Sequence, residues 1–205
     1  MHLTIPGPAG SLAALLDEVA HPRAVVVFAH PLPTHGGTMH TKAVFQAAKG
    51  LGRARCAVLR FNFRGVGGSA GRFDEGRGEM DDYHAALDLA ADRYPAVPLW
   101  AAGFSFGSWI AAETGATDDR VSALIAVAPP VSKYAFTHTL TSTKPKFFVQ
   151  GDLDDLCPLK HLWAFYAKLP EPKEIAVIDG AGHLFEGKTP EVGEALEDLV
   201  GDLGE

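Results

Sequence analysis

Residues 103–107 place a serine between two glycines, in the order Gly-Phe-Ser-Phe-Gly. An apolar run precedes this segment and a helical pattern follows it, which predicts a strand, a tight turn and a helix. Such a turn strains the serine backbone and leaves no room for side chains at Gly103 and Gly107. The segment predicts that Ser105 is a nucleophile held above the end of a sheet. The simpler alternative is a glycine-rich turn whose serine caps a helix.

A serine hydroxyl needs a base that removes its proton and a carboxylate that orients the base. On a strand-turn-helix scaffold of this kind, the acid and then the histidine follow the serine along the chain. Three histidines lie beyond Ser105, namely His138, His161 and His183. Only His183 directly follows a predicted strand, in a loop that glycines make adaptable. We therefore expect His183 to be the base.

The acid is expected in the loop after the apolar run at 146–150, which reads Gly-Asp-Leu-Asp-Asp. Asp154 stands three residues past Gly151, far enough along the loop to reach back to a histidine. Asp152 and Asp155 favour turn or helix-cap roles, although Asp152 stays open as an alternative acid. Asp179 is a weaker candidate because it lies in the histidine's own loop. Asp154 is the predicted acid.

Attack on a carbonyl creates an oxyanion, which two preorganised N–H groups would stabilise. The first predicted donor is Phe106, directly after the serine. The second should follow the strand at 24–29, where the chain reads His-Pro-Leu-Pro. Because the two prolines have no N–H, Leu32 is the donor expected at 31–33. If Ser105 were absent, we would interpret residues 30–33 simply as part of a proline-rich loop.

The elements that must position these residues alternate along the chain. Apolar runs predict strands at 24–29, 56–61, 98–103, 122–128, 146–150 and 174–178, and helical patterns lie near 40–52, 79–93, 106–116, 158–168 and 190–203. An opening hairpin at 2–5 and 11–18 adds an antiparallel edge. This order predicts one α/β domain over 1–205: a three-layer sandwich whose mostly parallel, twisted sheet carries helices on both faces.

Composition narrows the partners and the location. The net charge is −7 and the basic residues are scattered, so a nucleic-acid partner is not expected. The N-terminal segment lacks a signal pattern and no apolar run has the length of a membrane span, which predicts a cytoplasmic protein with no membrane partner. Cys56 and Cys157 have no metal-ligand spacing and are expected to be small apolar fillers.

Two cofactor patterns compete with this interpretation. Gly65, Gly67 and Ala70 satisfy a dinucleotide-binding pattern after a strand, but the next helical pattern starts only near residue 79 and the strand is not the first of the series. Three histidines within residues 30–40 invite a metal site, yet their spacing fits no common zinc signature. No cofactor and no metal are expected.

Taken together, these segments resemble the α/β-hydrolase superfamily, and most closely its small bacterial members without a lid. The motifs AHPLPTHGG, RFNFRGVGGSAGRFDEG, GFSFGS, QGDLDDLCP and GAGHLF stand in the family's order over nearly the whole chain. The resemblance implies that Ser105 is the nucleophile, Asp154 the acid and His183 the base. It also implies that 62–71 is a structural glycine loop beside the site.

The oxyanion loop departs from the family pattern. Many relatives have histidine-glycine there, whereas this chain has His30 and Pro31, so the second donor is less well defined by the resemblance than the triad is. Capped relatives insert a helical domain where this chain has only residues 129–145, too few for a lid. The site should be open, with Leu32, Tyr134 and Phe136 as apolar substrate-binding residues beside Phe106.

The predicted activity is that of a serine hydrolase. It would cleave an ester, thioester or amide of a small or exposed acyl substrate through an acyl-enzyme on Ser105. A non-catalytic scaffold or binding protein on the same fold is the alternative, because a fold does not determine an activity. An exposed apolar surface near an open site could also support a homodimer.

Overall fold

The structure is a computed structural model that describes residues 1–201 and 203. Its strands are β1 (His2–Gly7), β2 (Gly10–Asp17), β3 (Ala24–Ala29), β4 (Cys56–Phe61), β5 (Leu99–Phe104), β6 (Val121–Val127), β7 (Lys146–Gly151) and β8 (Lys173–Ile178). Its helices are η1 (Pro33–His35), α1 (Lys42–Arg53), α2 (Arg77–Arg93), α3 (Phe106–Thr117), α4 (Leu159–Tyr166) and α5 (Thr189–Gly201). The predicted strands and the five longer helices are confirmed to within a few residues. The short helix η1 was not predicted, and residue 202, inside the predicted last helix, lies outside the described residues.

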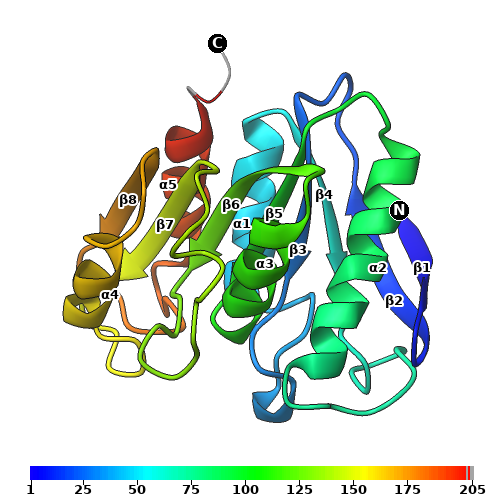
Figure 1. The fold of residues 1–205 in the computed structure, drawn as a ribbon, viewed down its shortest axis with the longest axis horizontal. Helices are drawn as coiled ribbons and strands as arrows, with labels where there is room; N and C mark the ends of the chain where they lie inside the picture. The colour runs from blue at the N-terminus through cyan, green and yellow to red at the C-terminus, as the bar shows by residue number, and fades with distance from the viewer. Residues whose placement is uncertain (202, 204–205) are drawn as a thin grey trace.

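The strands form one sheet in the order β1-β2-β4-β3-β5-β6-β7-β8. β1 and β2 are antiparallel to their neighbours, whereas β3 to β8 are parallel (Figure 1). Every residue of β3, β4, β5 and β7 is buried, because these strands are covered on both faces. The continuous apolar runs of the sequence reflect this two-sided cover.

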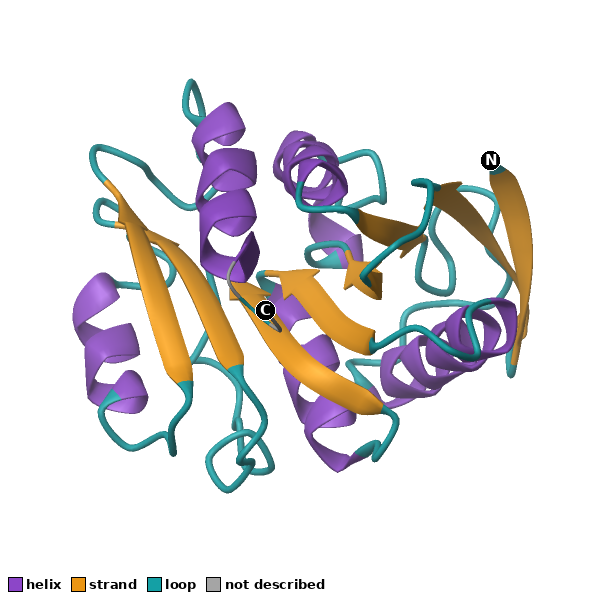
Figure 2. Cartoon of the chain, turned by 90° about the horizontal axis from the view of Figure 1, so that it is seen from above, coloured by secondary structure: helices purple, strands orange, loops and turns teal. Residues whose placement is uncertain are grey.

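Helices cover both faces of the sheet, as Figure 2 shows from above. Alternate residues of β3 point to opposite faces, so Val26 packs in the cluster that includes α1 and α5, and Val27 in the cluster that includes α2 and α3. Leu162 of α4 packs against Phe148 of β7. The predicted three-layer α/β architecture is confirmed.

The parallel strands place their following loops at one edge of the sheet. The loops after β3, β5, β7 and β8 carry the four predicted segments of the site. The structure describes every residue between β6 and β7, and this connection contains neither a helix nor a strand. This is expected for a chain without a cap domain. In the part of the chain that the structure describes, no helix has both the length and the apolar character needed to cross a bilayer.

Candidate active site

The turn between β5 and α3 holds Ser105 in a strained backbone conformation. Its φ of 52° and ψ of −121° lie where residues other than glycine are rarely found. A Cβ atom on Gly103 would lie 2.2 Å from the Gly107 carbonyl oxygen, and one on Gly107 would lie 2.4 Å from the His30 carbonyl oxygen. The glycines are therefore required by close backbone contacts, which is the reason that the motif suggested.

Ser105, His183 and Asp154 form a continuous hydrogen-bonded chain. The Ser105 Oγ and the His183 Nε2 are 2.8 Å apart, and the His183 Nδ1 is 2.8 Å from the Asp154 Oδ2. Because a carboxylate only accepts hydrogen bonds, the proton lies on Nδ1 and leaves Nε2 free to accept the serine proton. The structure thus brings together the predicted nucleophile, base and acid from the loops after β5, β8 and β7.

Four donors hold the Asp154 carboxylate, whose side chain is fully buried. Oδ1 accepts the backbone N–H groups of Leu156 and Cys157, at 3.0 and 2.7 Å. Oδ2 accepts the Gln150 side-chain amide at 2.9 Å in addition to His183. The same amide also donates to the Cys157 carbonyl oxygen at 2.7 Å, so Gln150 clamps the loop as well as the acid.

Sequence reasoning missed Gln150, although one signal was present. It is a polar residue that follows three apolar residues at the end of the predicted strand, and the structure buries it completely. The alternative acids lie elsewhere: Asp179 is exposed, and within the described chain Asp152 makes no hydrogen bond to His183. The structure therefore places Asp154, and not Asp152, against the histidine.

The predicted oxyanion donors flank the serine. Leu32 and Phe106 line the same cleft as Ser105. Among the described residues, neither the Leu32 nor the Phe106 backbone N–H finds an acceptor, so both are available to a ligand. The Phe106 N–H also belongs to the first turn of α3, where the helix dipole favours negative charge.

The fully buried His30 orients the peptide that carries the Leu32 N–H. Its Nδ1–H donates to the Pro31 carbonyl oxygen at 2.6 Å, and its Nε2 accepts the Phe63 N–H at 3.1 Å. Burial lowers the pKa of His30 from 6.5 to about 4, which keeps the ring neutral, as this pairing requires. Since the Pro31 carbonyl and the Leu32 N–H share one planar peptide group, fixing the first aims the second.

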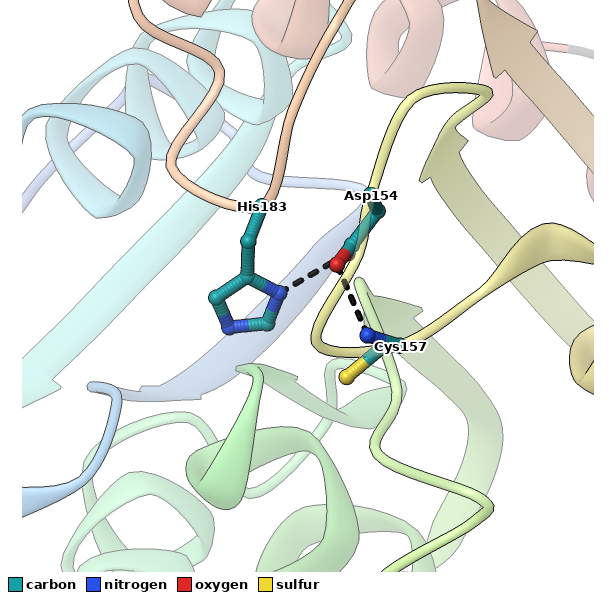
Figure 3. Close-up of side chains that lie close together, drawn as sticks. All are labelled: Asp154, Cys157 and His183. Carbon is teal, nitrogen blue, oxygen red and sulfur yellow. Dashed lines mark hydrogen bonds and ion pairs between the residues drawn. The ribbon is translucent and has the colours of Figure 1, made fainter.

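This arrangement also bears on the metal interpretation of residues 30–40. Both ring nitrogens of His30 are engaged inside the protein, so His30 is not available as a ligand. A different group lies at the site, where ligand atoms of Asp154, Cys157 and His183 come within 4.8 Å of one another (Figure 3). Hydrogen bonds already occupy Asp154 and His183, and burial raises the pKa of the Cys157 thiol to about 12. Asp154 and His183 are thus engaged with each other, and the Cys157 thiol is held in its neutral form, which is a poor metal ligand.

The structure also shows the surroundings of the two cysteines and of the glycine loop at 62–71. Cys56 and Cys157 are free and buried, in line with the expectation of small apolar fillers. In the loop at 62–71, the Asn62 side chain accepts the Met39 N–H at 2.8 Å. The next helix, α2, begins only at Arg77, so no helix opens within the glycine run as a dinucleotide site would require.

A cleft of about 400 Å³ opens beside the serine. Its lining residues are Pro31, Leu32, His35, Ser105, Phe106, Pro130, Lys133, Tyr134, Leu156, Cys157, His183 and Leu184. Most of these side chains are apolar, which suits the acyl part of a substrate.

Phe136 corrects the predicted lining. It is only 3% exposed and packs against Phe165 of α4, with ring centroids 5.3 Å apart, so it does not line the cleft. Trp109 explains the difference. Its indole N–H donates to the Ala135 carbonyl oxygen and its ring stacks on Tyr134 at 4.4 Å, so Tyr134 faces the cleft while Phe136 turns into the core.

Comparisons with known proteins identify the family. Residues 20–142 match a family model described as serine aminopeptidase, S33. An α/β serine hydrolase homologue from Coxiella burnetii is 38% identical with a TM-score of 0.90, covering 97% of this chain and 96% of the other. A Xanthomonas campestris protein, described as an α/β serine hydrolase without lid, is 33% identical with a TM-score of 0.90, covering 98% and 93%.

A curated relative adds an activity of its own. The monoacylglycerol lipase of Mycolicibacterium smegmatis is 28% identical over 173 residues, which cover 82% of this chain and 59% of that protein. The predicted superfamily and the absence of a cap domain agree with these findings. The chain is a hydrolase that belongs to the α/β-hydrolase superfamily, with the fold of its lidless serine hydrolases.

Proposed function

We propose that the protein is a serine hydrolase that cleaves an ester, thioester or amide of a small or exposed acyl substrate through an acyl-enzyme on Ser105. The observation that carries this proposal is the hydrogen-bonded chain from the Ser105 hydroxyl through His183 to Asp154 at the floor of an apolar cleft. The same geometry supports the sequence-based roles of nucleophile, base and acid.

In the acylation step, the Ser105 Oγ attacks the carbonyl carbon while the His183 Nε2 takes the serine proton. Asp154 stabilises the imidazolium that forms. The carbonyl oxygen becomes an oxyanion, which the N–H groups of Phe106 and Leu32 meet. When the tetrahedral intermediate collapses, the bond to the leaving group breaks, the leaving group takes the proton from His183, and the acyl group stays on the serine.

In the deacylation step, water gives a proton to the His183 Nε2 and attacks the acyl carbon. The second tetrahedral intermediate expels the Ser105 oxygen, which recovers its proton from His183. The products are a carboxylic acid and the free enzyme. Water supplies the proton that replaces the one carried off by the leaving group, so Ser105 and His183 end the cycle in their starting protonation states and no cofactor is required.

Esters are the first substrates to assay. The M. smegmatis relative is a monoacylglycerol lipase, and the cleft of this chain is walled by Leu32, Phe106, Tyr134 and Leu156. An apolar wall favours the hydrocarbon part of an acyl chain, at about 25 cal/mol per Å² of buried apolar surface. A series of p-nitrophenyl esters of increasing chain length would measure how far this wall extends.

The deciding test is covalent capture by a fluorophosphonate probe, combined with the Ser105→Ala variant. We expect the wild type to be labelled on Ser105, and the variant to lose about 10³-fold or more of its turnover while keeping its fold by circular dichroism. A wild-type protein that is folded, unlabelled and inert towards all the esters would instead support the non-catalytic scaffold. Hydrolysis by the Ser105→Ala variant at the parent rate would contradict the assignment of the nucleophile.

A further inference from the structure

Lys133 brings a positive charge to the wall of the cleft. It lies in a tight turn after β6, where the N–H groups of Lys133 and Tyr134 both donate to the Pro130 carbonyl oxygen. Lys133 and Tyr134 line the cleft together with Ser105. Within the described part of the chain, the Lys133 ammonium makes neither an ion pair nor a hydrogen bond.

The charge around the cleft is opposite to that of the whole chain. The protein carries 25 acidic residues against 18 lysines and arginines. Yet the lining contains Lys133 and His35 and, among the described residues, no aspartate or glutamate. Among the described residues, the cleft thus holds a cation without an ion-pair partner in a protein whose net charge is −7.

The surroundings of the ammonium strengthen its effect on a bound anion. Lys133 is itself exposed, but the apolar residues Leu32, Phe106 and Leu156 of the same cleft reduce the amount of water around a ligand, and a lower local dielectric strengthens the attraction between charges. The ammonium also acts on the Cys157 thiol that lines the cleft: burial and then the Asp154 carboxylate raise the pKa of this thiol, and Lys133 opposes that rise. A negative group bound in the cleft would therefore be attracted by the Lys133 ammonium.

On the proposed acyl-enzyme mechanism, the acyl part of the substrate would occupy the cleft that Lys133 lines. The leaving group must lie beside the His183 Nε2, which protonates it. Leu184 follows His183 and lines both the cleft and a second hollow of about 620 Å³, whose other lining residues are Thr41, Lys42, Ala43, Glu186, Gly187, Thr189 and Pro190. Space for a leaving group thus exists on the far side of Leu184.

We propose that Lys133 makes the cleft selective for acyl chains that carry a carboxylate at their far end. The inference rests on the proposed hydrolase function and names its substrate class: half-esters, half-thioesters or half-amides of dicarboxylic acids. The apolar walls hold the methylene chain, and the Lys133 ammonium pairs with the terminal carboxylate.

The test compares two p-nitrophenyl esters that differ only in charge. One is the half-ester of adipic acid, and the other is its isostere with a terminal carboxamide. We expect the wild type to favour the carboxylate by about fivefold in kcat/KM, which is the upper range for an accessible ion pair. Because salt screens exposed charges, the preference should shrink in 1 M NaCl.

Three variants identify the source of the preference. Lys133→Met should abolish it and Lys133→Arg should retain it, whereas Lys49→Met, which removes an exposed lysine on α1, should leave it unchanged. An equal carboxylate-to-amide ratio in the wild type and in Lys133→Met would overturn the assignment, as would a wild type that prefers the amide.

Failure of this inference is distinguishable from failure of the proposed function. If Lys133→Met hydrolyses the carboxamide ester and is labelled by the fluorophosphonate, the hydrolase is intact and an unchanged ratio counts against Lys133 alone. If the folded wild type hydrolyses neither ester and resists the label, the proposed function is wrong and the inference fails with it.

Discussion

The buried His30 should make the stability of this protein depend on pH. The ring is fully buried, and burial lowers its pKa from 6.5 to about 4. Its Nε2 accepts a hydrogen bond from the Phe63 N–H, and this acceptor is lost if the nitrogen takes up a proton. The folded protein therefore resists protonation of His30, whereas the unfolded chain does not.

The sign and size of the effect follow from the two pKa values. Between pH 6.5 and 4 the unfolded state binds a proton at His30 that the folded state does not. The stability that the neutral His30 contributes is therefore fully present above pH 6.5 and is lost as the pH falls towards 4. One pKa unit corresponds to about 1.4 kcal/mol, so the complete loss is about 3 kcal/mol. Between pH 7.5 and 5.0 the loss is about 2 kcal/mol.

Urea unfolding of the wild type and of His30→Gln at these two pH values measures this loss. Glutamine stays neutral, so the variant lacks the pH-dependent contribution of His30. At pH 7.5 we expect the variant to be less stable by about 1–2 kcal/mol, because it cannot replace both hydrogen bonds of the ring. At pH 5.0 the free energy of unfolding of the wild type, relative to that of the variant, should be lower than at pH 7.5 by about 2 kcal/mol.

Two results would refute this reasoning. A difference between wild type and His30→Gln that stays constant from pH 7.5 to 5.0 would mean that His30 is not held neutral by burial. An equally large pH-dependent change in the difference between wild type and His161→Gln, which replaces an exposed histidine on α4, would mean that the effect is not specific to a buried ring. His30→Gln should also lower kcat more than it changes KM, because the ring no longer holds the peptide that carries the Leu32 N–H.

Three further substitutions test the support of the site. Asp154→Asn should lower kcat for ester hydrolysis by about 10⁴-fold, because an amide does not hold the required histidine tautomer; Asp152→Asn should change it less than about tenfold, and the reverse order would make Asp152 the acid. Gln150→Leu should lower the free energy of unfolding, measured in urea, by about 2–3 kcal/mol, because the buried Asp154 carboxylate and the buried Cys157 carbonyl each lose one hydrogen-bond donor. An unchanged free energy of unfolding would show that Gln150 does not support the acid. Gly37→Ala would place a Cβ 2.1 Å from the Pro31 carbonyl oxygen and so displace the peptide that carries the Leu32 N–H; kcat should fall about tenfold or more with little change in KM. As a control, Gly52→Ala, whose methyl group meets open space, should not alter kcat.

The sheet could be predicted because its central strands are buried on both faces. Such strands tend to be apolar along their whole length, as β3 and β5 are, and this pattern is visible without coordinates. Ser105 and His183 could be selected for a similar reason. Ser105 directly follows β5 and His183 lies in the short loop after β8. The glycines on either side of the serine are needed because close backbone contacts leave no room for a side chain.

Other features depend on contacts between segments that are distant in sequence. Phe136 and Tyr134 are both aromatic and stand two residues apart, so the chain alone did not show that Trp109 would turn one to the cleft and the other to the core. His30 looked like a potential metal ligand until the structure placed Phe63 against it. Gln150 acquires its role only because Asp154 folds back over the end of β7.

By itself, the sequence determined which elements form, in what order, and which residues could attack a carbonyl, because burial patterns and tight turns act over short stretches of chain. Only the tertiary structure decided which side chains support the acid, orient the second N–H donor and charge the wall of the cleft. Those properties arise from hydrogen bonds and electric fields between loops that meet at one edge of the sheet, and no local pattern encodes such meetings.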